Sequence, residues 1–178
     1  FLQGKLHTGG KIFADRQICN LKYCNSTEAA GNLWTKLCNI NFDYHVQGEF
    51  VYMKIFISNG QNGYTTQNAY IDLYMQLGWT GTNNGRLGCN AVLHPLSSGF
   101  TLNNAKVKVI YNNYRDYDVW VYAGYNYSRA NYIVETEGNV NVTKIGTCQS
   151  SEPTGTACDL AMVQQDDCSP IMNLPYTT

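Results

Sequence analysis

The sequence has few charged residues and no strong excess of either sign. Only 14% of its 178 residues are charged, with 12 basic against 13 acidic side chains, whereas an ordinary globular domain has about 25%. A chain without a basic field does not attract a phosphate backbone, so we expect no nucleic-acid binding. The same composition excludes a coiled coil, which is rich in Ala, Glu, Lys, Leu and Arg.

Long apolar runs and polybasic clusters are also missing. No run of 18 apolar residues is present that could span a bilayer, and no basic cluster suits an anionic membrane surface. We therefore expect no membrane insertion. The chain begins at Phe1 without a visible signal peptide, as a mature product or an excised fragment would.

Motifs of catalysis and metal binding are absent. The sequence contains no GxSxG elbow, no HExxH helix and no phosphate-binding loop. It has no CxxC pair, and His7, His45 and His94 lie at no zinc-finger spacing. The 13 acidic residues form no distinctive catalytic pair. The sequence predicts no enzyme activity, no metal and no cofactor; a small hydrolase with scattered catalytic residues remains the enzymatic alternative.

The number and spacing of the cysteines suggest where in or outside the cell the protein is found. Seven cysteines without a metal spacing favour disulfides, and hence an extracellular or surface-exposed protein. Cys19 lies near Cys24, and Cys158 lies near Cys168, so we predict that each pair is bonded and orders a terminal segment. Sequence alone does not fix the connectivity. The odd count leaves at least one thiol that is buried or bonded between subunits.

Apolar and polar residues alternate through the middle of the chain. In the clearest example Ile71, Leu73, Met75, Leu77 and Trp79 point one way, which is typical of an antiparallel strand with one buried face. The eight expected strands cover residues 34–44, 50–58, 70–79, 86–94, 106–111, 118–123, 131–137 and 139–145. Because Asn- and Gly-rich turns separate them and no amphipathic helix is present, the sequence predicts an all-β fold, either an antiparallel β-sandwich or a jelly roll.

The two ends of the chain lack this alternation of apolar and polar residues. Residues 1–32 and 146–178 are predicted to be irregular segments beside a sandwich formed by residues 33–145. The length suits one domain, and no linker divides the chain. We therefore expect a single domain over residues 1–178.

Tyrosine is unusually abundant, with 14 residues. A core of this size does not absorb all of them, since each buried hydroxyl needs a hydrogen-bond partner. Rigid tyrosine rings mixed with Asn, Ser and Gly are typical of binding surfaces, and they also suit sugars, whose C–H faces stack on aromatic rings. The alternatives are cross-strand tyrosine pairs facing solvent or a subunit interface.

Loops at the ends of antiparallel sandwiches usually carry recognition. One candidate loop runs from Trp79 to Arg86, and the other runs from Tyr111 to Asp118, with residues 125–129 nearby in sequence. The predicted ligand-binding residues are Asn83, Asn84, Arg86, Tyr114, Asp116, Tyr125, Tyr127 and Arg129.

The polar side of the clearest strand suggests association between copies. Tyr70, Asp72, Tyr74 and Gln76 make a face that is too apolar for an ordinary monomer surface and too polar for a core. A self-complementary contact would use this face, so we predict a homo-oligomer, with a trimer preferred.

Three stretches carry a family resemblance. They are Trp34-Thr35-Lys36-Leu37, Val119-Trp120-Val121-Tyr122 and Asn131-Tyr132-Ile133-Val134-Glu135. Residues 33–145 resemble the receptor-binding tips of phage tail fibres, related to the tips of bacterial adhesive fibres. This resemblance implies a trimeric β-sandwich at the end of a fibre that binds a cell-surface glycan or another receptor. The cysteines depart from phage tips and fit export through an oxidising compartment or a viral spike made in a eukaryotic host.

We therefore expect a non-enzymatic adhesin or receptor-binding tip. The alternative is a structural capsid or fibre-cap domain whose aromatic surface is the subunit interface.

Overall fold

The computed structural model describes the backbone in eleven ranges, namely residues 7–8, 11–12, 15–20, 33–42, 49–59, 68–78, 86–96, 99–113, 115–124, 128–158 and 160–165. Side chains are described at residues 34–42, 49–58, 68–78, 87–96, 99–113, 115–124, 130–158, 160 and 162–165. The described elements are all strands, which confirms the all-β prediction.

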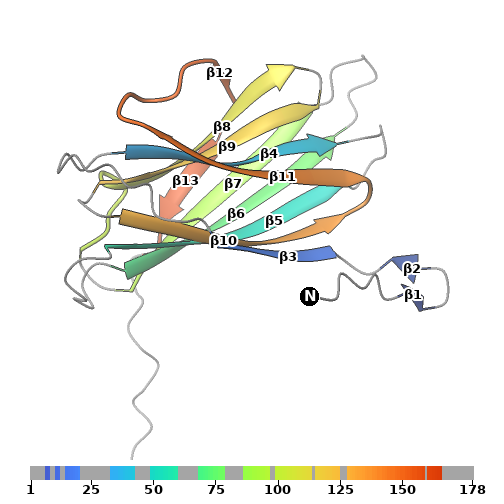
Figure 1. Ribbon diagram of the computed structural model, residues 1–178, viewed down its shortest axis with the longest axis horizontal. Coiled ribbons are helices and arrows are strands. Elements are labelled where there is room, and N and C mark those ends of the chain that lie inside the picture. The colour runs from blue at the N-terminus through green and yellow to red at the C-terminus, as the bar shows by residue number, and fades with distance from the viewer. Residues whose placement is uncertain are drawn as a thin grey trace, which may run out of the picture.

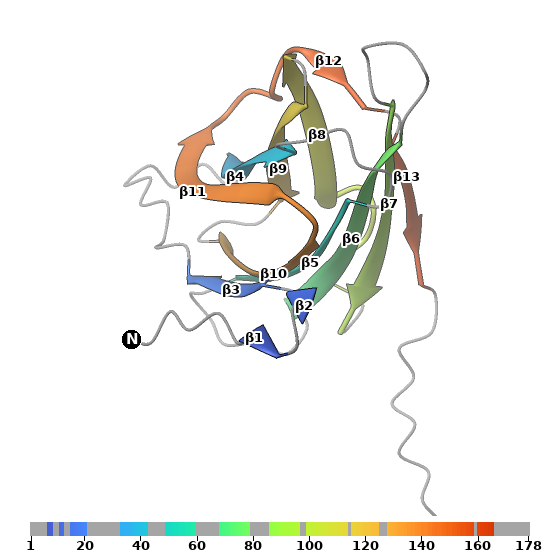
Figure 2. The ribbon, with the colours of Figure 1, turned by 90° about the vertical axis from the view of Figure 1, so that its right-hand side faces the viewer.

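Two sheets make up most of the molecule, and Figures 1 and 2 show them facing each other. The six-stranded sheet has the order β13-β7-β6-β5-β10-β3, and the five-stranded sheet has the order β11-β4-β9-β8-β12. The first consists of β3 (Asp15–Asn20), β5 (Phe50–Asn59), β6 (Asn68–Gly78), β7 (Arg86–Pro95), β10 (Ser128–Glu137) and β13 (Leu160–Gln164). The second consists of β4 (Leu33–Phe42), β8 (Ala105–Asn113), β9 (Asp116–Ala123), β11 (Val140–Gln149) and β12 (Thr156–Ala157). A separate pair joins β1 (His7–Thr8) to β2 (Lys11–Ile12).

The core lies between the two sheets and follows from the alternation in the sequence. On β6 the side chains of Ile71, Leu73, Met75 and Leu77 are buried, while their neighbours on the other face are partly or fully exposed. Val119 and Val121 of β9 enter the same core from the five-stranded sheet. One apolar face on each sheet therefore accounts for the two-layer arrangement.

The chain passes between the sheets at both edges. Near one edge a turn at Gly138 and Asn139 joins β10, which lies beside the edge strand β3, to β11, the edge strand of the five-stranded sheet. Gly138 has a φ of +88°, a conformation that glycine adopts without strain. At the other edge the chain leaves β12, beside β8, and enters β13, beside β7.

The terminal segments contribute more structure than the sequence predicts. β3 pairs antiparallel with β10, although its sequence DRQICN shows no clear alternation. β13 pairs parallel with β7 within the segment that was predicted to be irregular. Both are edge strands, so partners in the sheet organise them where local sequence does not. The eight predicted strands correspond to β4 through β11.

No helix in the described part of the chain is long and apolar enough to cross a membrane.

Candidate functional site

Most of the predicted ligand-binding residues lie where the structure gives no side-chain description. Asn83, Asn84, Tyr114, Tyr125 and Tyr127 lie outside the described residues. Only the backbone is described for two more: Arg86 begins β7, and Arg129 pairs in register with Ser58 of β5. Their roles in binding remain predictions.

Asp116 is described, and it belongs to a polar cluster on the outer side of the five-stranded sheet. The Asn39 side-chain amide donates to Asp116 Oδ1, and it donates to Asp118 Oδ1 at 2.9 Å. Asn112 Nδ2 also donates to Asp116 Oδ1, at 3.0 Å. Lys36 Nζ lies 2.5 Å from Asp118 Oδ2. The two carboxylates are thus engaged by donors from β4 and β8, an arrangement that stabilises the sheet.

The fold separates residues that the sequence places close together. Asp116 begins β9 and Ala123 ends it, so the length of this eight-residue strand separates the two residues by about 23 Å. Arg86 pairs with Gly78, at the end of the six-stranded sheet where Phe50 begins β5. The described backbone thus places Arg86, Asp116 and Arg129 on three different strands, β7, β9 and β10.

Among the described residues, aromatic side chains gather on the outer side of the six-stranded sheet. Strand register aligns them in rows: Phe56, Tyr70 and His94 form one row, and Tyr52, Tyr74 and Asn90 form another. We call this surface the aromatic face, and its members are Phe50, Tyr52, Lys54, Phe56, Tyr70, Asp72, Tyr74, Gln76, Asn90, Val92 and His94. It contains the strand face that was predicted to contact another copy.

Asp72 lies at the centre of the aromatic face, between the two rows. Tyr52 Oη donates to Asp72 Oδ1 at 2.5 Å, and Lys54 Nζ lies 3.8 Å from the same oxygen. His94 Nε2 lies 2.9 Å from Asp72 Oδ2. The Asp72 carboxylate on β6 thus contacts side chains of β5 and of β7, the strands on either side, and these contacts fix the positions of the side chains.

These groups also hold one another by ring contacts. The Tyr70 and His94 rings stack with centroids 4.4 Å apart and planes 12° from parallel, and Lys54 Nζ lies 4.5 Å from the Tyr70 centroid. Phe50 stacks on Tyr74 with centroids 5.7 Å apart. Aromatic and cation–π contacts of this kind stabilise a fixed arrangement, while Phe56 and Tyr74 remain 39% and 38% exposed.

The phenol of Tyr52 is protonated throughout the neutral range. Desolvation by burial raises its pKa, and the hydrogen bond to Asp72 raises the pKa further because the donated proton stabilises the neutral phenol. Tyr52 is therefore a permanent donor to Asp72 under physiological conditions.

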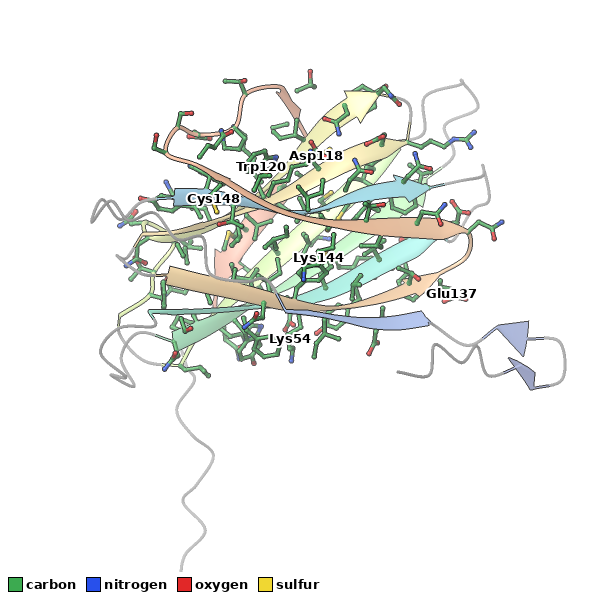
Figure 3. The ribbon with its side chains drawn as sticks, viewed as in Figure 1. Lys54, Asp118, Trp120, Glu137, Lys144 and Cys148 are labelled. Atoms are coloured by element: carbon green, nitrogen blue, oxygen red, sulfur yellow. The ribbon has the colours of Figure 1, made fainter. Side chains whose placement is uncertain are left out.

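The outer side of the five-stranded sheet differs because a chain segment covers part of it. Lys108 Nζ donates to Glu152 Oε1 at 2.8 Å and to the Pro153 carbonyl oxygen at 3.0 Å. Pro153 is buried, and Ile110 of β8 is only 4% exposed beneath the segment. Figure 3 shows Asp118 and Trp120 on this side and Lys54 on the opposite side of the molecule. The segment around Pro153 thus covers Lys108 and Ile110 on the outer side of β8.

The cysteines require a correction. Cys158 was predicted to bond to Cys168, but it is a thiol in the structure. It packs against the core between the two sheets, so the fold, rather than proximity in the sequence, decides the surroundings of this thiol. Cys148 is disulfide-bonded, which the sequence did not predict. The predicted Cys19–Cys24 bond and Cys168 lie outside the described side chains.

Sequence reasoning found the strand face of Tyr70 and Asp72 but missed its partners on β5 and β7. The pairing of Tyr52 and His94 with Asp72 depends on register across three strands, which no local pattern gives. The available signal was the aromatic residues at alternate positions of the two strands, namely Phe50, Tyr52 and Phe56 on β5 and Tyr70 and Tyr74 on β6. Among the described residues, no group of three His, Cys, Asp or Glu side chains could hold a metal ion.

Comparison with known proteins gives a likeness in structure only. No protein-family model matches the chain, and no curated protein matches it significantly. Pantoea stewartii WceF, described as a glycan biofilm modifying enzyme with a bacteriophage tailspike-like parallel β-helix fold, matches 88% of this chain at 11% identity with a TM-score of 0.50. The tailspike proteins of Acinetobacter phage vB_ApiP_P1 and Acinetobacter baumannii phage AM24 match 80% and 76% of the chain at 12% identity, with TM-scores of 0.36 and 0.32.

These matches cover only part of the other proteins. The chain spans 23% of WceF, 25% of the first phage tailspike and 26% of the second. At these identities the likeness to WceF concerns the arrangement of strands, so a fold like this one occurs within a larger tailspike-like protein.

Proposed function

We propose that this chain is a non-enzymatic recognition domain, a β-sandwich tip of a trimeric surface or virion fibre, and that its aromatic face binds a cell-surface glycan. The observation that carries the proposal is the pair of exposed rings, Phe56 and Tyr74, on a sheet face whose other rings are held in place around Asp72. The structural likeness to WceF supports the fold of such a tip.

The chemistry of the face suits a neutral sugar. Lys54 and His94 lie against Asp72, so the face offers no strong net charge to an ionic ligand. Exposed rings stack on the C–H side of a pyranose, and the nearby amides of Gln76 and Asn90 are exposed and free to hydrogen-bond with hydroxyls. Because the rings are held before the ligand arrives, little side-chain entropy is lost on binding.

Recognition without catalysis fits the described carboxylates. Asp72, Asp116 and Asp118 each accept hydrogen bonds from side chains of neighbouring strands. Asp116 and Asp118 share the Asn39 amide as a donor, so both carboxylates belong to the contacts between β4 and β9. Weak binding at each face would be strengthened by the several copies of a trimer.

Glycan-array binding by the full chain tests the proposal. We expect the Phe56→Ala/Tyr74→Ala variant to lose at least about tenfold in affinity, since buried aromatic contacts dominate recognition energies. Ile145→Ala is the control, because Ile145 is similarly exposed, at 36%, but belongs to β11 of the other sheet and to neither candidate loop. Unchanged binding by the double variant would place the site elsewhere, and absence of glycan binding by the unmodified chain would reject the proposed ligand.

One observation favours the alternative of a subunit interface. Val163 of β13 is 55% exposed and lies beside Val92 in the same row as Asp72, so it extends the aromatic face with apolar surface. If this face joins copies, the Phe56→Ala/Tyr74→Ala variant will sediment as a monomer where the unmodified chain sediments as an oligomer. If the face binds glycan, the variant will keep the oligomeric state and lose only the glycan.

A further inference from the structure

Two aromatic pairs lie on the aromatic face, and a polar row runs between their exposed rings. Phe50 stacks on Tyr74 in one pair, with ring centroids 5.7 Å apart. Phe56 and Tyr70 form the other pair, with centroids 6.5 Å apart. Each pair joins a phenylalanine of β5 to a tyrosine of β6. Tyr74 is the exposed ring of the first pair, and Phe56 is the exposed ring of the second.

Strand register fixes the separation of these two exposed rings. Phe56 pairs with Tyr70 of β6, and Tyr74 lies four residues further along that strand. A strand rises about 3.3 Å per residue and its neighbour lies about 4.8 Å away, so the Cα atoms of Phe56 and Tyr74 are about 14 Å apart. A single pyranose is too small to stack on both rings across that separation.

A pair of opposite charges occupies the interval between the two rings. Lys54 and Asp72 are partners in the row midway between those of Phe56 and Tyr74. Their side chains are 35% and 24% exposed, so both reach the surface. An ammonium group donates hydrogen bonds and a carboxylate accepts them, and hydroxyl groups of a sugar can make both kinds of bond. The surface therefore offers an aromatic ring, a polar pair and a second aromatic ring in succession.

We propose, on the basis of the proposed function, that the glycan bound by the aromatic face is an oligosaccharide of about three consecutive sugar residues, which crosses β5 and β6 from Phe56 to Tyr74. The two outer sugars stack on Phe56 and on Tyr74, while hydroxyl groups of the middle sugar contact Lys54 and Asp72. A monosaccharide reaches only one of the two rings, so it is expected to bind much more weakly than the longer glycan.

The contacts beneath this path hold its groups at a fixed spacing. Tyr52 Oη donates to Asp72 Oδ1 at 2.5 Å, and His94 Nε2 lies 2.9 Å from Asp72 Oδ2. These contacts keep the carboxylate between the two exposed rings, and the stacking of Phe50 supports the Tyr74 ring. Because the spacing exists before binding, an oligosaccharide that matches it orders few side chains of the protein.

Glycan fragments of increasing length test this proposal. The array glycan that the unmodified full chain retains most strongly is partly hydrolysed with acid, and the separated fragments are titrated against the chain by calorimetry. We expect the affinity to rise at least about tenfold from the single sugar to the fragment of three sugars, because the longer fragment gains a second aromatic contact. Further sugars should add little.

Single variants assign this gain to the two rings. Phe56→Ala and Tyr74→Ala should each remove most of the difference between the single sugar and the three-sugar fragment, since either variant leaves one ring. Ile145→Ala is the control, because Ile145 is 36% exposed on β11 of the other sheet, and it should keep the full difference. If a variant does not fold, the fragment series on the unmodified chain decides the question alone.

The outcomes separate the length of the glycan from glycan binding itself. Equal affinity for the single sugar and the three-sugar fragment, or a length dependence that both single variants retain, overturns the proposed length although the chain binds glycan. A chain that retains no glycan on the array rejects the proposed function, and the proposed length falls with it.

Discussion

Gly138 packs so closely on Glu49 that a Cβ atom added to the glycine would lie 2.6 Å from Glu49 Cγ. Glu49 is 2% exposed, and its Oε1 accepts a hydrogen bond from the Asn139 N–H at 3.2 Å. The turn that carries the chain from one sheet to the other thus rests on a buried carboxyl group. Space and backbone conformation both require glycine there.

We expect Gly138→Ala to destabilise the chain by about 2 kcal/mol, because an L-residue at φ of +88° is strained and its Cβ displaces Glu49. Urea denaturation followed by circular dichroism measures the change. Gly88→Ala is the control: its added Cβ would meet its nearest neighbour, the Gln76 carbonyl oxygen, at 3.8 Å, an ordinary contact. Equal stability of the two variants would show that the turn tolerates a side chain.

Lys36 is expected to matter more than other lysines of its sheet. Asp118 is 7% exposed, and Lys36 lies 2.5 Å from its carboxylate. Lys36→Met leaves this nearly buried carboxylate without its cation, which should cost about 1–3 kcal/mol. Lys106→Met, on the exposed end of β8, should cost less than about 0.5 kcal/mol. Matching denaturation curves for the two variants would contradict the importance of the Lys36–Asp118 pair.

Glu152 should titrate below the ordinary range of a glutamate. The hydrogen bond from Lys108 lowers the pKa of its carboxyl group in the folded chain. A lowered folded pKa means that this pair stabilises the fold above the ordinary glutamate pKa and that the stabilisation is lost as pH falls through the folded pKa. Carboxyl chemical shifts followed by NMR measure the midpoint, which Lys108→Met should return to the ordinary range. An unchanged midpoint in that variant would rule out Lys108 as the cause.

The tyrosines predicted from the sequence give a separate test of where a ligand binds. If the loop residues bind the glycan, replacing Tyr114 and Tyr125 by Ala abolishes glycan binding and leaves the melting temperature nearly unchanged. If the aromatic face alone forms the site, the same variant binds glycan as the unmodified chain does. Glycan-array binding and thermal denaturation measure the two outcomes.

The strand pattern was predictable because one physical constraint repeats along the chain. Each central strand buries one side, so alternation alone placed Ile71 and Leu73 in the core and Tyr70 and Asp72 outside. β3 and β13 could not be predicted from alternation, because they are edge strands whose conformation depends on partners distant in sequence.

The candidate site was predictable only in part. The outward positions of Tyr70, Asp72 and Tyr74 follow from period two, but the contacts of Tyr52 and His94 with Asp72 follow from register between three strands. A shift of one residue would send these side chains to the core.

The parallel pairing of β13 with β7 has a consequence for how the protein reaches this fold. Leu160 and Cys89 are neighbours in that ladder but about 70 residues apart along the chain, and such distant contacts form late and slowly. Until β13 arrives, one edge of β7 presents unpaired backbone groups to any strand nearby. A β13 from a second copy fits that edge equally well, so refolding at high concentration is expected to yield strand-exchanged dimers beside self-contained molecules.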